Sequence, residues 1–369
     1  MDKVVKKILE KKNINANELA KRINITPGNL SKFLNKKIEI GFSTFLSIIM
    51  ELIPEEEMEL MDRYARLCKK PENIRMCMEY ASRHQMTGLL DFLIEKAKKM
   101  KNCQTVESAR VYELYEKVAN GEFLGNSPEL GLSFKITYEE SAILFRIMFI
   151  YNMYIHRKFD YLFLVAKHLE EWIGKLPNSY IKESFEKRVC MIFSDAYRYI
   201  YDMEKCREYS YRIIQSPYSR GKAAGDACYN LGMSYLFEDA EKALFFMSES
   251  IKSYNEFGLA NYAKQVKESM VPFVKNFYNL YDDESLIEEP EEIAHYYAKN
   301  GKFEEALKIL NKLEESPYID YLKGLCYTGE KGVEYLYKSM IFFERNGDKF
   351  CSQLPKLELI KRGKSWAAY

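Results

Sequence analysis

The residues of this chain that are best suited to recognition chemistry lie near its N-terminus, between positions 26 and 37. Hydroxyl, amide and glycine residues come first in this stretch, and lysines follow them. These residue types contact the phosphates and base edges of duplex DNA when a helix carries them into the major groove. The candidate DNA-binding residues are Thr26, Gly28, Asn29, Ser31, Lys32, Lys36 and Lys37.

Two short helices joined by a tight turn would position these residues. The sequence from 15 to 37, NANELAKRINITPGNLSKFLNKK, predicts such a helix-turn-helix. In its first helix, Leu19 and Ala20 share an apolar side with Ile23. We expect this helix to stop at Asn24, because asparagine tolerates the left-handed backbone that the turn requires.

The second helix of this pattern carries the candidate DNA contacts. Thr26 can cap its N-terminus, and Pro27 fits the first helical position, where a missing N–H costs nothing. Leu30, Phe33 and Leu34 recur at helical spacing and are expected to be buried. The polar residues between them would then face outward, as a recognition helix requires.

The charge of the chain is unevenly distributed. Residues 1–54 contain ten Lys and Arg against five Asp and Glu, whereas the remainder contains 45 basic and 49 acidic residues. A positive balance beside the helix-turn-helix is typical of a surface that binds phosphates. A solvated lysine face is the simpler interpretation of the same residues, but their position next to the motif favours DNA.

Length and composition restrict the remaining possibilities. A chain of 369 residues is long enough for two units or for one solenoid. It contains no run of about 18 apolar residues, so no membrane-spanning helix is expected. The eight cysteines are scattered without a CxxC pair, which favours free thiols in a reducing cytoplasm.

Most of the chain reads as paired helices. The clearest pair is residues 294–317, AHYYAKNGKFEEALKILNKLEESP, where Ala294, Tyr297 and Ala306 match the tetratricopeptide pattern and Gly301 makes the turn. A second pair covers residues 230–251, and weaker ones cover residues 151–169, 194–214 and 321–343. The predicted fold is therefore all-α, with a helix-turn-helix DNA-binding domain at 1–54 followed by a tetratricopeptide-like solenoid at 55–369. Generic helical packing is the alternative interpretation of the weaker pairs.

Motifs of common enzymes are absent from the sequence. It has no phosphate-binding loop, GxGxxG, HExxH or GxSxG pattern, and its four histidines are not spaced as metal ligands. His295 lies inside the clearest helix pair and is expected to be a packing residue. We therefore expect a binding protein without a cofactor or a metal, and not an enzyme.

A helix-turn-helix before a tetratricopeptide solenoid resembles the peptide-responsive regulators of Gram-positive bacteria, the Rap, NprR, PlcR, PrgX and Rgg group. Within this group, the chain most resembles the AimR family, the arbitrium receptors of temperate phages. The resemblance rests on CREYS at 206–210, LGMSYLFED at 231–239, AHYYAKN at 294–300, YLKG at 321–324 and NGDKFCSQLPKLELIKRG at 346–363. These segments follow one another in the same order as in the family.

The resemblance implies a function. Such receptors are cytoplasmic homodimers that bind a double-stranded DNA operator in the host cell and take part in the choice between lysis and lysogeny. They also bind a short signalling peptide of about six residues in the groove of the solenoid. A receptor of this kind would be a peptide-controlled transcriptional regulator that needs no membrane.

The resemblance also carries over candidate peptide contacts, residue by residue. The position of a family Asn falls on Asp195, a basic groove residue falls on Lys222, and the acidic residue of a loop falls on Asp348. A carboxylate of the peptide could pair with the lysine, and a peptide arginine with the acidic side chains. The full candidate set is Asp195, Lys222, Asn230, Met233, Glu291, Glu292 and Asp348.

Three departures from the family pattern concern this site and the dimer. Asp195 replaces an amide, and Met233 stands where relatives carry Asn, so the accepted peptide is expected to differ. The C-terminal sequence KSWAAY lacks the leucine-rich last helix of relatives, which bears on the dimer contact.

A competing hypothesis is an adaptor of the Rap type, whose solenoid would inhibit a protein partner. Such an adaptor needs neither the positive N-terminal charge nor a capped recognition helix.

Overall fold

The computed structural model describes residues 1–121, 135–216, 219–281 and 283–364. These residues form helices and the turns between them, with no strand among them, so the prediction of an all-α fold is confirmed. None of the described helices is long and apolar enough to cross a membrane. Residues 365–369 of the atypical C-terminal sequence lie outside the described residues.

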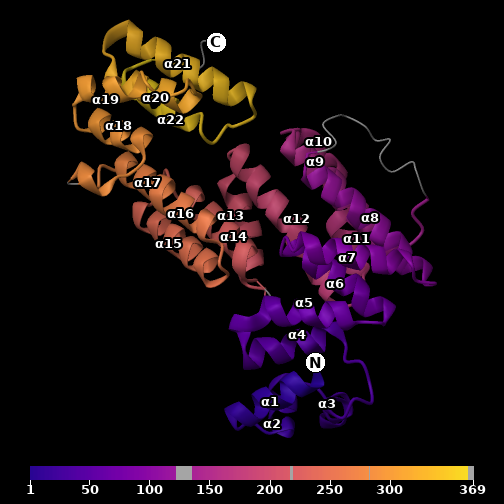
Figure 1. Cartoon of the computed structure of the whole chain (residues 1–369). Helices are drawn as coiled ribbons and strands as arrows, with labels where there is room; N and C mark the ends of the chain where they lie inside the picture. Colours follow the sequence, from indigo (N-terminus) through magenta and orange to yellow (C-terminus); the bar gives the residue numbers. More distant parts are fainter. Residues whose placement is uncertain (122–134, 217–218, 282, 365–369) are drawn as a thin grey trace. The chain divides into compact units, whose positions relative to one another are not determined.

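Two compact units divide the chain, and their helices are labelled in Figure 1. The first comprises Met1–Asn152 and Val165–Glu186, and the second comprises Met153–Leu164 and Lys187–Tyr369. Helix α12 (Tyr180–Tyr199) begins in the first unit and continues into the second.

The first unit contains α1 (Asp2–Lys12), α2 (Ala16–Arg22), α3 (Pro27–Leu34), α4 (Phe42–Leu52), the 3-10 turn η1 (Pro54–Glu56), α5 (Glu57–Leu67), α6 (Pro71–Arg83), α7 (Thr87–Lys98), α8 (Cys103–Ala119), most of α9 (Glu139–Ile155) and α11 (Leu169–Lys175). The second unit contains most of α10 (Phe159–Ala166), then α13 (Met203–Ile214), α14 (Gly221–Ser234), α15 (Ala240–Glu256), α16 (Ala260–Gln265), η3 (Val266–Met270), α17 (Val271–Phe277), η4 (Glu284–Leu286), α18 (Pro290–Lys299), α19 (Phe303–Leu310), α20 (Pro317–Cys326), α21 (Gly329–Arg345) and α22 (Gln353–Lys361).

The helix-turn-helix forms where the sequence predicts it. Helix α2 ends at Arg22, and Asn24 adopts the left-handed backbone with a φ of 53°. Pro27 opens α3, and Thr26 occupies the N-cap position. The Thr26 side chain makes no capping hydrogen bond, so its expected contribution comes from backbone position alone. A side-chain cap is instead found at α2, where Asn15 Oδ1 accepts from the backbone N–H of Glu18 at 2.8 Å.

An aromatic core continues from the helix-turn-helix into the following helices. Phe33 of α3 lies edge-on to Phe45 of α4, which stacks on Tyr64 of α5 at a centroid distance of 4.5 Å. Phe42 contacts Tyr64 as well, and these rings are buried. The predicted boundary at residue 54 coincides with η1, and a separate domain of residues 1–54 stays a prediction.

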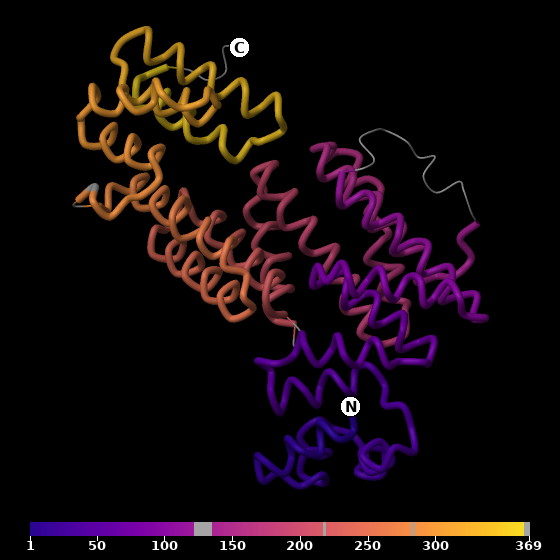
Figure 2. The backbone as a smooth tube through the Cα atoms, in the orientation of Figure 1, coloured from indigo at the N-terminus to yellow at the C-terminus, as the bar shows by residue number. Residues whose placement is uncertain are grey.

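The second unit is built from helix pairs that turn back on themselves, as the tube in Figure 2 shows. In the clearest pair, α18 and α19 are joined through Gly301, whose φ of 76° suits a residue without a side chain. Ala294 and Ala306 of this pair are fully buried, as the repeat pattern requires. In the pair α14–α15, a Cβ added to Gly225 would lie 2.3 Å from the Tyr254 ring. Small residues therefore set the close approach of paired helices.

All eight cysteines fall among the described residues and are free thiols, six of them buried. Burial raises the pKa of the Cys206 thiol to about 11, so it is protonated at neutral pH. The expectation of free, mostly buried thiols is confirmed.

Candidate nucleic-acid interface and ligand site

One face of α3 is buried and the opposite face carries the predicted DNA contacts. Leu30, Phe33 and Leu34 are at most 7% exposed and fix the helix against its neighbours. The seven predicted DNA-binding residues, Thr26, Gly28, Asn29, Ser31, Lys32, Lys36 and Lys37, are all exposed. The space above Gly28 is open, since an added Cβ would meet no atom within 4 Å. A surface of small polar groups at a helix N-terminus can approach base edges closely.

The end of α3 presents its lysines through a tight turn. Lys36 adopts a left-handed backbone with a φ of 58°, and its N–H donates to the carbonyl of Phe33 at 2.9 Å. The N–H of Lys37 donates to the carbonyl of Lys32 at 2.8 Å. These bonds satisfy the last carbonyls of the helix and leave the lysine side chains exposed, where they can neutralise phosphates.

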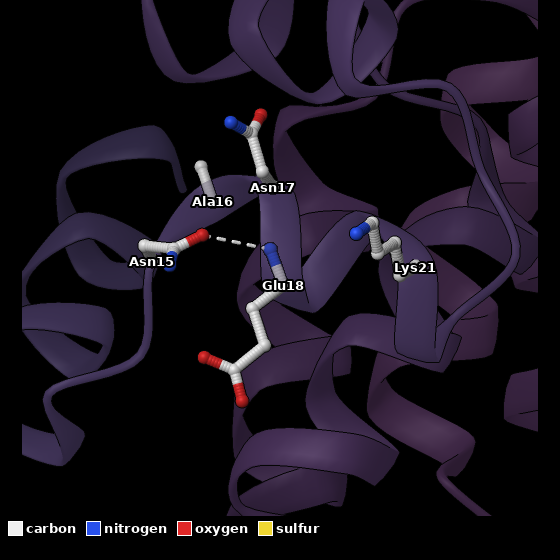
Figure 3. A pocket seen from close by; sticks show the side chains of 5 residues that line it. All are labelled: Asn15, Ala16, Asn17, Glu18 and Lys21. Atoms are coloured by element: carbon white, nitrogen blue, oxygen red, sulfur yellow. Dashed lines mark hydrogen bonds between the residues drawn. The ribbon is translucent and has the colours of Figure 1, made fainter.

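A shallow polar depression of about 480 Å³ lies at the start of α2, the helix that packs against α3 (Figure 3). Its lining residues are Asn15, Ala16, Asn17, Glu18 and Lys21. Asn17 and Lys21 are exposed, whereas Asn15 is engaged in the cap described above. Sequence reasoning did not select these residues, although Asn15 has the position of an N-cap residue directly before the first helix.

A buried arginine organises the polar residues of the second unit. Arg198 is 7% exposed; its Nε donates to Asn230 Oδ1 at 3.1 Å, and its Nη2 lies 3.5 Å from Asp195 Oδ1. Burial opposes its charge, but Tyr229 and Asp195 raise the pKa of Arg198 well above its ordinary value. Asp195 also accepts a hydrogen bond from the Tyr154 hydroxyl at 3.2 Å. Helices α12 and α14 are thus joined by a charged, hydrogen-bonded group.

Asp348 reaches the same group from the loop before α22. Its Oδ2 lies 4.0 Å from Arg157 Nη1, and the guanidinium groups of Arg157 and Arg198 each lie 4.6 Å from the centroid of the Tyr199 ring. The backbone N–H of Lys349 donates to the carbonyl of Tyr199 at 2.8 Å and fixes the loop there. We call the residues Arg157, Asp195, Arg198, Tyr199, Asn230 and Asp348 the arginine cluster.

The structure therefore brings together three of the predicted peptide contacts, Asp195, Asn230 and Asp348. Sequence reasoning missed the two arginines and the tyrosine between them. The spacing of three residues from Asp195 to Arg198 within one helix is a signal that could have identified the first ion pair. No local signal connects Arg157 with Asp348, because their contact depends on the folded chain.

Lys222 lies on the same helix as Asn230 and is already paired. Its Nζ donates to Asp226 Oδ2 at 2.7 Å, and the Tyr254 hydroxyl donates to Asp226 Oδ1 at 2.6 Å. Burial raises the pKa of Asp226; Lys222 and Tyr254 oppose this shift, and the charge of Asp195 adds to it. Lys222 precedes Asn230 of the arginine cluster by about two turns of α14.

Glu291 and Glu292, although adjacent, have different environments. Glu292 is 4% exposed and accepts hydrogen bonds from Tyr318 Oη at 2.8 Å and Asn276 Nδ2 at 2.9 Å. Its other neighbour is His295, whose Nδ1 lies 3.2 Å from Oε2. His295 is fully buried, as expected of a packing residue. Glu291 is exposed, and partial burial together with the charge of Glu292 raises its pKa. Of these two residues, Glu291 is the one whose carboxylate faces solvent.

Met233 is 3% exposed and lies in the hydrophobic core. The same core contains Leu236, Ala243 and Met247. Added to Gly232, a Cβ would meet Met247 at 2.9 Å, which shows how tightly this region is packed. The Met233 side chain therefore contributes to packing and not to a surface that a peptide can reach.

Family models match both the N-terminal region and the remainder of the chain. A model of the Cro/C1-type helix-turn-helix DNA-binding domain matches residues 4–48, and the AimR transcriptional regulator-like family model matches residues 57–361. The AimR transcriptional regulators of Bacillus phages SPbeta and phi3T are each 26% identical to this chain, across 98% of its length and 96% and 97% of theirs.

Solved structures show the same fold. The structure of SeMet-phAimR superposes with a TM-score of 0.81 at 26% identity and covers 99% of this chain and 97% of that one. The structure of phAimR with its ligand has a TM-score of 0.68 at 24% identity, over 88% of this chain and 98% of that one. The chain belongs to the AimR transcriptional regulator-like family, with a Cro/C1-type DNA-binding domain at its N-terminus.

Proposed function

We propose that this DNA-binding transcriptional regulator binds its operator as a homodimer and is controlled by a short peptide that binds in the second unit. The regulated process is the choice between lysis and lysogeny, in the cytoplasm of the host cell. The observation that carries the proposal is the arginine cluster, in which Asp195, Asn230 and Asp348 converge from separate parts of the chain. Lys222 lies on α14 together with Asn230 of this cluster. Acidic and basic groups of this kind suit a ligand with charges of both signs.

The resemblance to the AimR family favours a peptide of about six residues, and the charged groups of the site suit one arginine and a free C-terminus. Asp348 is the acidic group proposed to receive a peptide guanidinium, because its Oδ2 lies 4.0 Å from Arg157 Nη1, which is long for an ion pair. Its side chain is 10% exposed, and its Oδ1 accepts from the backbone N–H of Cys351. Lys222 is the group expected to receive the peptide carboxylate. Glu291 could add a second acidic contact, whereas the carboxylate of Glu292 is fully engaged.

The operator arm of the proposal is tested with duplexes selected from a random pool by the wild-type chain. In fluorescence anisotropy, the double variant with Asn29→Ala and Lys32→Ala should lose discrimination between selected and scrambled duplexes. Both side chains lie on the exposed face of α3. Lys252→Ala on α15 removes an exposed lysine far along the chain and should leave discrimination unchanged. Intact discrimination in the α3 variant would exclude α3 as the recognition helix.

The peptide arm uses synthetic hexapeptides with one arginine, screened by calorimetry against the full chain. Asp348→Asn should weaken the best binder at least about tenfold, since a charge-assisted pair is lost. The same peptide with its arginine replaced by citrulline should bind wild type and variant alike. Equal binding of the arginine peptide to both proteins would remove Asp348 from the site.

A further inference from the structure

The chain between the recognition helix and α4 is held by the start of α6. Glu39 lies in this connecting segment, and its carboxylate accepts hydrogen bonds from the backbone N–H groups of Lys69 at 3.0 Å and Lys70 at 3.2 Å. Lys70 is the N-cap residue of α6, so Glu39 satisfies donors that the helix leaves unpaired. A negative charge at this end also complements the helix dipole.

Asn73, in the first turns of α6, completes the attachment. Its Nδ2 donates to Glu39 Oε1 at 2.7 Å and to the carbonyl of Ile40 at 3.1 Å, while its Oδ1 accepts from the N–H of Phe42 at 3.0 Å. The Ile40 carbonyl accepts a further hydrogen bond from the Tyr64 hydroxyl at 2.8 Å. Asn73 is 2% exposed, so water does not compete for these bonds.

Aromatic packing closes around the same segment. The Phe42 ring lies 5.9 Å from the Tyr80 ring of α6 and 4.7 Å from the Tyr180 ring at the start of α12, measured between centroids. Phe42 is 1% exposed. A connecting segment that is both hydrogen-bonded and packed in this way cannot act as a loose linker, because movement would expose apolar rings and leave buried polar groups unpaired.

We propose that Asn73 is a positioning residue for DNA recognition. Together with Glu39, Ile40 and Phe42 it forms a joint that holds the recognition helix in one orientation on α5 and α6. In the homodimer proposed above, on which this inference rests, two rigid joints would present two recognition helices at one spacing. The joint would then make the protein selective for the distance between operator half-sites, and not only for their sequence.

The matched variants exchange donors and acceptors with little change in volume. Asn73→Asp loses the N–H groups that bind Glu39 and Ile40 and places two carboxylates side by side, so the joint should open. The double variant with Asn73→Asp and Glu39→Gln restores one donor and one acceptor across the same contact. Rescue by the double variant would separate loss of this contact from a general effect of substituting Asn73. Circular dichroism and a melting curve establish that each variant is folded.

The first measurement is made without DNA. Spin labels attached through non-natural amino acids at Lys21 and Lys117, both exposed residues of the first unit, report the distance between the helix-turn-helix and α8. We expect one narrow distribution for the wild type and the double variant, and a broad one for Asn73→Asp. A narrow, unchanged distribution for folded Asn73→Asp would overturn the joint.

The second measurement compares duplexes with two half-sites at the selected spacing, two half-sites moved apart by about half a helical turn, and one half-site. The wild type should lose at least about tenfold in affinity when the spacing changes, and Asn73→Asp less than about threefold. All variants should bind a single half-site within about twofold of the wild type. If Asn73→Asp keeps the tenfold spacing preference, the positioning role is wrong. If the wild type binds paired half-sites no better than a single half-site, the proposed homodimer is contradicted. The spin-label distance distributions would still test whether Asn73 holds the joint rigid.

Discussion

At the scale of the residue, the pair Glu291 and Glu292 shows how the fold assigns different roles to identical side chains. Consecutive helix residues point about 100° apart, so one carboxylate faces solvent while the other enters the contact between α17, α18 and α20. The buried carboxylate is retained because Tyr318, Asn276 and His295 surround it with polar atoms. Burial without such partners would be unfavourable.

This difference predicts unequal effects on stability. Glu292→Ala removes the carboxylate that accepts from the Tyr318 hydroxyl and the Asn276 amide and should lower the free energy of unfolding by about 2–4 kcal/mol. Glu291→Ala should change it by about 0.5 kcal/mol or less, because that side chain is exposed. Urea unfolding followed by circular dichroism compares the two. Similar losses in both variants would contradict the assignment of the buried network to Glu292.

A second prediction at this scale concerns pH. The pKa of Asp226 is raised by burial, and a peptide carboxylate bound to Lys222 would raise it further by repulsion. Peptide binding should therefore take up a proton at Asp226, and affinity should increase as the pH falls through the raised pKa. Calorimetry between about pH 4 and 7 measures this slope. Asp226→Asn should flatten it, and an unchanged slope in that variant would assign the proton to another group.

At the scale of the element, paired helices approach closely where a glycine faces a large side chain. Gly225 of α14 lies under the ring of Tyr254 of α15, whose hydroxyl holds Asp226 and through it Lys222. The helix pair and the lysine site therefore depend on one contact. Gly232 repeats the arrangement further along α14, against Met247 and the carbonyl of Ala243.

Gly225→Ala is expected to be destabilising by about 1–3 kcal/mol, because its Cβ would lie 2.3 Å from the Tyr254 ring and force it to move. The displaced hydroxyl should also weaken peptide binding through Asp226. Gly88→Ala in α7 is the matched control: no atom lies within 4 Å of its added Cβ, so stability should be unchanged or slightly higher. Thermal unfolding compares the stability of the two variants. If Gly225→Ala is as stable as the wild type, the pair α14–α15 does not need this close contact.

At the scale of the whole molecule, charge is separated along the chain. The excess of five positive charges in residues 1–54 is set against an excess of four negative charges in the rest. Phosphate attraction is therefore concentrated on the helix-turn-helix, where Lys32, Lys36 and Lys37 are exposed. The acidic remainder gives the rest of the chain no general affinity for DNA.

This arrangement predicts a defined salt dependence. Replacing Lys36 and Lys37 by Gln should weaken binding to all duplexes by similar factors and reduce the slope of log affinity against log salt by roughly two per bound protomer. Titrations at several salt concentrations measure the slope. Lys252→Gln on α15 serves as the control with the same type of change. A slope that stays constant in the double variant would show that these lysines do not contact phosphates.

Local sequence sets those features of this protein that depend on neighbouring residues. Asn24 and Pro27 set the turn and the start of α3, and Gly301 sets the turn between α18 and α19, because backbone preferences act within a few residues. Burial of Leu30 and Phe33 likewise follows from helical spacing. The resemblance to the AimR family added candidate ligand residues, and three of them, Asp195, Asn230 and Asp348, lie together in the arginine cluster.

Contacts between polar groups depend on the packing of helices that are far apart in the chain. Arg157 donates to the carbonyl of Asn346, 189 positions away, and the arginine cluster exists only because the folded chain brings these parts together. Burial of Met233 and the attachment of residues 39–42 to Asn73 depend in the same way on neighbours from distant helices. Local preferences act over one or two turns, whereas side-chain contacts depend on how whole helices pack.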